Sequence, residues 1–156
     1  QFTKGVGNMT LACVIIGLGS AVAVILDEGH ILDTVVMSLT NAVNVFPPFL
    51  RGVALFLVNS IVNFFIVSGS GQAAAVMPVL TPVADLAGVS RQTCVLAFKL
   101  GDGFSNFILP QNDTLMSYIG IAGISYDKWM KFMFKLFLLW SLIGAFVLVL
   151  AYFIQY

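Results

Sequence analysis

The chain has 156 residues, of which 60% are hydrophobic and 9% are charged, whereas roughly a quarter of the residues of an ordinary soluble domain are charged. The composition therefore predicts a membrane protein. Seven basic residues balance seven acidic ones, and this zero net charge gives no reason to expect a nucleic acid or an anionic surface as a partner.

Residues 9–26 predict a membrane-spanning helix, because an apolar run of about 20 residues crosses the hydrocarbon core of a bilayer. The segment 30–46 has apolar residues near helical spacing with polar residues between them, and it predicts an amphipathic helix at the membrane interface. His30, the only histidine, is expected to be solvated there rather than to relay protons. Pro47-Pro48 end this helix, because neither residue donates a backbone hydrogen bond.

Two further features bear on the thiols and on the extent of the chain. Cys13 and Cys94 lie far apart inside apolar runs, so we expect two buried free thiols rather than a disulfide or a metal-ligand pair. The chain opens with Gln1, and its first apolar run lacks the small-residue cleavage site of a signal peptide. We therefore expect a piece of a longer protein.

A helical hairpin is predicted over residues 49–89, where two apolar arms flank the tip Ser68-Gly69-Ser70-Gly71-Gln72. Unpaired backbone groups are costly in lipid, so a non-helical break at this tip must be wrapped in protein or line a wet cavity. Hydropathy leaves open whether the hairpin is re-entrant or forms two full spans. Asn59 and Asn63 share a face of the first arm, where they either hold helices together or line a site.

Residues 91–124 predict a discontinuous helix, with interruptions at Gly101-Asp102-Gly103-Phe104-Ser105-Asn106 and Pro110-Gln111-Asn112-Asp113-Thr114. Half-helices that end inside a membrane offer backbone donors to anions and carbonyls to cations. Lys99 and Asp102 share a face if the helix continues that far. They either neutralise each other as a structural pair or take part in the function of the protein. Asp113 is either a cation ligand, a proton carrier or a solvated residue near the membrane surface.

Residues 125–135 predict an interfacial helix, because Tyr126 and Trp129 are accompanied there by three lysines, and residues 136–155 predict a final span. By the positive-inside rule this lysine-rich side is cytoplasmic, which places the C-terminus outside. No phosphate-binding, dinucleotide-binding or metalloprotease motif and no Ser/His/Asp set is present, so an enzyme is not expected.

Three segments carry a resemblance to a known family: Asn63-Phe64-Phe65-Ile66 through Gly71-Gln72-Ala73-Ala74, Gly88-Val89-Ser90-Arg91-Gln92, and Gly101-Asp102-Gly103-Phe104-Ser105-Asn106. They resemble the signature segments of the YfcC-type carriers. These carriers are grouped with the C4-dicarboxylate anaerobic carriers of bacteria, and more distantly with the p-aminobenzoyl-glutamate and divalent-anion/sodium transporters. The resemblance runs over nearly the whole chain.

The resemblance implies an all-α integral membrane protein of the bacterial inner membrane with the ion-transporter-superfamily fold. In that fold two inverted repeats each contribute a hairpin whose tip meets a broken helix, usually within a homodimer. This chain shows one hairpin and one broken helix, so it corresponds to the C-terminal half, and the N-terminal repeat is the expected partner. Pairing of two copies in opposite orientations is disfavoured by the lysine bias.

The resemblance also implies a site for a small-molecule substrate and for a coupling Na⁺ or H⁺, with Na⁺ near Ser70 and Ser105, and no other cofactor. Two departures from the family pattern are Val67 in place of a proline and the polar run Gln111-Asn112-Asp113. The residues implied to bind substrate or ion are Asn63, Ser68, Gly69, Ser70, Gly71, Gln72, Gly101, Asp102, Gly103, Ser105, Asn106, Gln111, Asn112, Asp113 and Thr114.

The function expected on these grounds is secondary active transport of a small amino acid or carboxylate by alternating access, with basic amino acids such as arginine and ornithine as candidates. The alternatives are a C4-dicarboxylate carrier, a channel, and a non-transporting helical subunit of a membrane complex whose glycines only pack helices.

Overall fold

The computed structural model describes residues 28–29, 32–65, 67 and 69–156, and over these residues the chain forms helices and no strand. The all-helical fold class is therefore confirmed. The span predicted at 9–26, His30 and Cys13 lie outside the described residues. The elements are, in order, α2 (Leu32–Asn44), the short 3-10 helix η1 (Pro48–Leu50), α3 (Arg51–Phe65), α4 (Gly69–Leu86), α5 (Arg91–Ser105), α6 (Asp113–Ile121) and α7 (Tyr126–Phe153).

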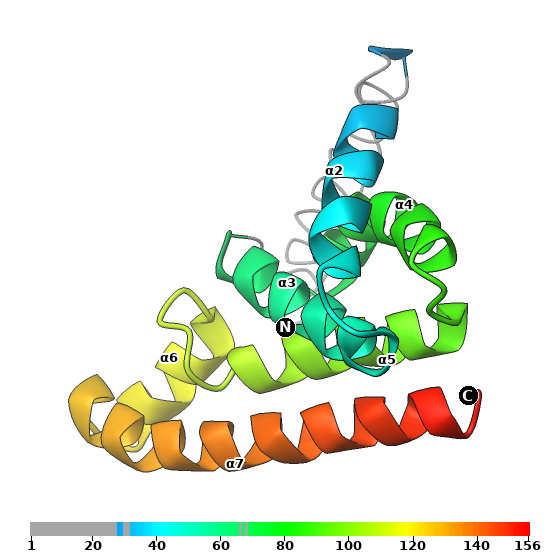
Figure 1. Cartoon of the computed structure of the whole chain (residues 1–156). Coiled ribbons are helices and arrows are strands. Elements are labelled where there is room, and N and C mark those ends of the chain that lie inside the picture. The colour runs from blue at the N-terminus through cyan, green and yellow to red at the C-terminus, as the bar shows by residue number, and fades with distance from the viewer. Residues whose placement is uncertain (1–27, 30–31, 66, 68) are drawn as a thin grey trace.

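The helix α5 is packed against three others, α3, α4 and α7 (Figure 1). α3 runs alongside α5 in the same direction and makes the largest contact with it, since Gly52 lies against Thr93 near the start of α5 and Asn63 against Ser105 at its end. α7 runs antiparallel along α5, and α4 packs against both α2 and α5. The short α6 stands beside the first turns of α7. The core lies where α3, α4 and α5 meet, and Cys94 is a buried free thiol within it, as expected.

Gly101 allows the close approach of α3 and α5. A Cβ added at this position would lie 2.9 Å from Cβ of Asn59 and 3.1 Å from the backbone oxygen of Phe56. Only a residue without a side chain fits such a contact. α5 is helical through Gly101 to Ser105, so the interruption expected at 101–106 is wrong. The break lies at residues 106–112, between α5 and α6, and it overlaps the second expected interruption at 110–114.

The irregular part of the hairpin tip is also shorter than expected. α4 begins at Gly69, so 69–72 form its first helical turn rather than an irregular loop, while Ser68 lies outside the described residues. Pro78 and Pro82 lie inside the same helix.

α7 is one continuous helix, Tyr126–Phe153, where we expected an interfacial helix and a separate span. No glycine or proline separates the two expected parts at 135–136, so nothing in the backbone interrupts the helix there. Its charged residues all precede residue 136, and 136–153 would extend about 27 Å at about 1.5 Å per residue. Within the described residues α7 is the one helix that is long and apolar enough to cross a membrane; Met37–Asn44 and Pro48–Phe64 qualify only as a pair bent by 115°.

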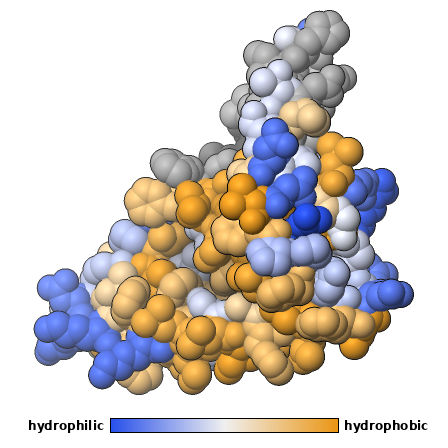
Figure 2. Space-filling view, viewed as in Figure 1, coloured by the Kyte–Doolittle hydropathy of each residue, from blue (hydrophilic) through white to orange (hydrophobic). Residues whose placement is uncertain are grey.

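Apolar residues form a belt on the face shown in Figure 2, between hydrophilic residues at its lower left and its right. On α7, Phe132, Leu139, Leu142 and Phe146 are each more than half exposed and form one stripe, whereas Gly144 and Leu148 face α5 and α3. Such an extended apolar surface is typical of a protein in contact with lipid.

Candidate binding site

Asn63 ties the first hairpin arm to the end of α5. Its side chain is fully buried, and Nδ2 donates to Oγ of Ser105 at 2.7 Å and to Oδ1 of Asn106 at 2.9 Å, with the backbone oxygen of Asp102 at 3.3 Å. Ser105 in turn donates to the backbone oxygen of Gly101. The last turn of α5 is thereby fixed to α3 at the point where the helix ends.

Asp102 places a carboxylate at the junction where α3 and the start of α4 meet the end of α5. The residue is 8% exposed, and its Oδ1 accepts a hydrogen bond from Nδ2 of Asn106 at 3.0 Å. Oδ2 faces the start of α4, because a Cβ added to Gly69 would lie 3.0 Å from it. The partial positive charge of a helix N-terminus favours a carboxylate beside its first turn, which helps to explain how this acidic residue is accommodated in an apolar surrounding.

Lys99 does not neutralise Asp102. The lysine lies on the exposed side of α5, with Nζ 5.5 Å from the ring centroid of Phe98. The one ion pair among the described residues is between Arg91 and Asp85, at the surface. Of the two alternatives left open by the sequence, a neutralising Lys99–Asp102 pair is therefore wrong. No lysine or arginine among the described residues is hydrogen-bonded to Asp102.

Two more buried amides lie beside this cluster. Nδ2 of Asn59 donates to the backbone oxygen of Leu55 at 2.8 Å, and Nε2 of Gln72 donates to the backbone oxygen of Asn59 at 3.1 Å. Gln72 therefore reaches from the first turn of α4 to α3. Within the part of the chain that the structure describes, the side-chain oxygens of Asn59, Asn63 and Gln72 are buried without a hydrogen-bond partner.

Side chains satisfy the irregular backbone of residues 106–112. Tyr126 donates its hydroxyl to the backbone oxygen of Ile108 at 2.6 Å, Trp129 donates Nε1 to that of Phe107 at 2.9 Å, and Asn112 donates Nδ2 to that of Asn106 at 3.2 Å. Backbone carbonyls that leave a helix within a membrane need such partners. The first turn of α7 thus holds the break in place.

The structure brings together five of the residues implied by the sequence, namely Asn63, Gly69, Asp102, Ser105 and Asn106, with Gln72 beside them through Asn59. The others take different places. Gly101 packs against α3, Gly71 is buried, and Ser70, Gln111 and Thr114 are exposed. A Cβ at Gly103 would have no atom of another described element within 4 Å. Asn112 caps α6 by accepting a hydrogen bond from the backbone nitrogen of Leu115 at 3.0 Å; the side chain of Asp113 is outside the described part.

Asn59 was not among the residues assigned to the site from the sequence. Its spacing of four from Asn63 was the available signal, because that spacing puts both amides on one helix face. The close contact with Gly101 shows that this face meets α5.

Comparison with known proteins places the chain among membrane carriers. Residues 1–153 match the family described as C4-dicarboxylate anaerobic carrier (DcuC). YfcC of Escherichia coli (strain K12), provisionally named a basic amino acid antiporter, is 35% identical over 136 residues, which cover 84% of this chain and 27% of that protein. An uncharacterized protein of Haemophilus influenzae (strain ATCC 51907 / DSM 11121 / KW20 / Rd) is 30% identical over 149 residues, 96% of this chain and 29% of that protein. The chain thus spans less than a third of the length of these curated relatives. No solved structure matches it.

Proposed function

Because this chain belongs to the C4-dicarboxylate anaerobic carrier family, we propose that it forms part of a secondary transporter that moves a small amino acid or carboxylate by alternating access. Membership of a carrier family supports a transporter rather than an enzyme. The single observation that carries the proposal is the junction where the start of α4 and the end of α5 meet around buried Asp102. Helix ends that meet inside a membrane are the usual place for substrate and ion sites in such carriers.

The charge of this junction favours a substrate with a cationic group. Asp102 is its acidic residue, and Lys99 points away from it. Recognition of a dicarboxylate would call for arginine or lysine side chains, and none of the described residues hydrogen-bonded to Asp102, Ser105 or Asn106 is basic. A basic amino acid such as arginine or ornithine fits this arrangement better, and the name of the Escherichia coli relative agrees with it.

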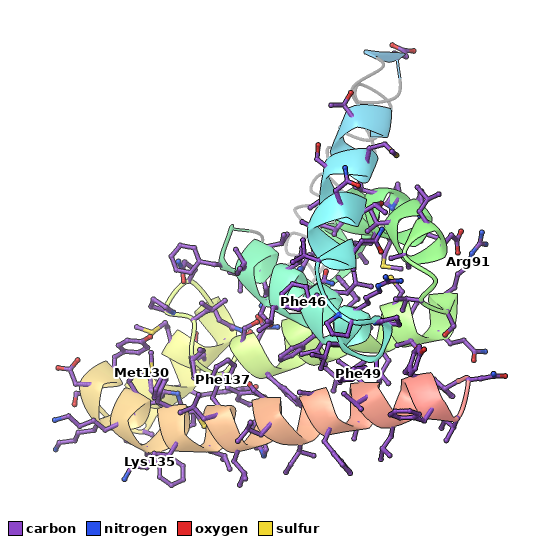
Figure 3. The ribbon with its side chains drawn as sticks, viewed as in Figure 1. Phe46, Phe49, Arg91, Met130, Lys135 and Phe137 are labelled. Atoms are coloured by element: carbon purple, nitrogen blue, oxygen red, sulfur yellow. The ribbon has the colours of Figure 1, made fainter. Side chains whose placement is uncertain are left out.

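The same proposal places the protein in the bacterial inner membrane, with the lipid bilayer around the apolar belt and the lysine-rich end of α7 on the cytoplasmic side. Lys135 and Arg91 lie at opposite ends of the molecule (Figure 3), as expected if they face opposite membrane surfaces. The C-terminus then lies outside. An N-terminal repeat of the same protein would complete the pocket, and homodimerisation is the expected assembly.

Counterflow tests the proposal. The intact protein is reconstituted into liposomes loaded with unlabelled arginine, and the uptake of radiolabelled arginine is measured. Uptake by the wild type and a loss of about tenfold in Asp102→Asn would support it, since removing the buried charge removes the partner of the cationic group. Asp85→Asn is the matched control, because this carboxylate is exposed and paired with Arg91 at the surface.

The remaining outcomes separate the alternatives. Counterflow of succinate without counterflow of arginine would indicate a C4-dicarboxylate carrier. Unitary currents in a planar bilayer would indicate a channel. The absence of both currents and counterflow would indicate a packing subunit, and counterflow that is unchanged in Asp102→Asn would contradict the assigned site.

A further inference from the structure

Three lysines share the outer face of α7 with an apolar stripe. Lys128, Lys131 and Lys135 are exposed and lie three and four residues apart, which puts them on one side of the helix. The same spacing continues through three side chains that are more than half exposed: Leu139, Leu142 and Phe146. Figure 3 shows Lys135 on the side of α7 that points away from the other helices. The lysines therefore extend the lipid-facing surface of α7 toward its polar end.

None of these lysines has an acidic partner among the described residues. The one ion pair there joins Arg91 to Asp85, and Arg51 donates to two backbone oxygens. Asp127 is the acidic residue in the first turn of α7, and it forms no ion pair with a lysine. Protein groups therefore satisfy the two arginines, whereas the amines of the α7 lysines are left for another partner.

A groove of about 360 Å³ joins the charged and the apolar parts of this face. Five residues of α7 line it: Lys131, Phe132, Lys135, Leu136 and Leu139. Its two lysines are one turn apart, about 6 Å along the axis at about 1.5 Å per residue, which is close enough for both amines to reach one phosphate group. The groove thus offers two cations beside a hydrocarbon surface.

We propose that this groove binds one anionic phospholipid. The phosphate sits between the amines of Lys131 and Lys135, and an acyl chain lies along Leu136 and Leu139. Charge complementarity selects the headgroup, because two amines without a carboxylate partner favour a lipid with net negative charge over a zwitterionic one. The proposal goes beyond the transport function, since it holds whichever substrate the protein carries.

The position of the groove along α7 favours a lipid over an anion dissolved in water. Residues 136–153 contain no charged side chain and extend about 27 Å at about 1.5 Å per residue, so Leu136 and Leu139 lie where the hydrocarbon of a bilayer begins. Lysine stems of this kind extend along apolar surface and place their amines at the headgroups. A free phosphate would meet the amines alone, whereas a phospholipid covers the amines and the leucines together.

Native mass spectrometry tests the site in the intact protein. The protein in neutral detergent is titrated with phosphatidylglycerol or with phosphatidylcholine of the same acyl chains, and the lipids bound to each molecule are counted. We expect the double variant Lys131→Gln/Lys135→Gln to lose one bound phosphatidylglycerol, with an affinity at that site lower by about fivefold for each lysine. Phosphatidylcholine binding should not change, and Lys131→Arg/Lys135→Arg should retain the phosphatidylglycerol.

Lys128→Gln is the matched control, because it removes one charge from the same face of α7 outside the groove and should cost much less affinity. All three lysines are exposed, so these substitutions remove no buried contact. An unchanged phosphatidylglycerol count in the double variant, or an equal loss in Lys128→Gln, would overturn the site.

Two further results would also contradict a lipid site. Displacement of the phosphatidylglycerol by excess inorganic phosphate at constant ionic strength would indicate an anion site that does not use the acyl chain. Equal binding of both lipids to the wild type would indicate apolar contact without headgroup selection. Neither result bears on the transport proposal, because lipid binding is measured here without arginine counterflow.

Discussion

Replacing Gly101 with alanine is expected to push α3 and α5 apart. The new Cβ would lie 2.9 Å from Cβ of Asn59, 3.1 Å from the backbone oxygen of Phe56 and 3.1 Å from the backbone nitrogen of Ser60. Two of these three neighbours are backbone atoms, so a side-chain rotation cannot relieve the contact. Overpacking of this kind costs about 1–3 kcal/mol, while the higher helix propensity of alanine returns about 1 kcal/mol. The net effect is a destabilisation of up to about 2 kcal/mol.

Gly103→Ala is the matched control for this prediction. It lies on the same helix, and within 4 Å of the position of its Cβ there is no atom of another described element, so alanine should add only helix propensity and leave the protein as stable as the wild type or more so. Thermal unfolding of the intact protein in detergent measures both variants. The reasoning is refuted if Gly101→Ala unfolds at the same temperature as Gly103→Ala, because the contact between α3 and α5 would then have room for a methyl group.

Three further predictions concern the junction and the surface. Gly69→Ala places a Cβ 3.0 Å from Oδ2 of Asp102. The carboxylate can move to relieve this contact, so the unfolding temperature should change little, whereas arginine counterflow should fall because Asp102 is displaced. Equal counterflow in this variant and the wild type would contradict the prediction. Asn63→Ala removes the amide nitrogen that donates to Oγ of Ser105 and to Oδ1 of Asn106. It should lower the free energy of unfolding in denaturant by about 1–3 kcal/mol, so an unchanged midpoint would show that these hydrogen bonds are not formed. The hydrogen bond from Arg91 holds the pKa of the exposed Asp85 below its usual value. The stabilisation of the folded protein by this pair is therefore present above the usual pKa of an aspartate and is lost as the pH falls through the lowered value. The unfolding temperature of Asp85→Asn should accordingly match the wild type in strong acid and fall slightly below it at neutral pH, and a larger gap in acid than at neutral pH would reverse the assigned sign.

Sequence alone determined the class of protein and its family. Hydrophobic composition and run lengths predicted a helical membrane protein, and the segments around Asn63, Gln72 and Asp102 indicated the carrier family to which the chain belongs. These features are readable because hydropathy and family motifs are properties of consecutive residues.

Tertiary structure alone decided where the helices break and which polar groups meet. Glycine lowers helix propensity, so the run around Gly101 predicted a break by local rules, but that turn is helical where it packs against Asn59, and the break lies at residues 106–112, where it overlaps the second predicted interruption at 110–114. Likewise, Lys99 and Asp102 are close in sequence, yet one faces outward and the other faces α3 and α4. The physical reason is that periodicity shows which residues share a helix face, whereas the neighbour that this face meets depends on how the helices cross, and that crossing is set by long-range packing.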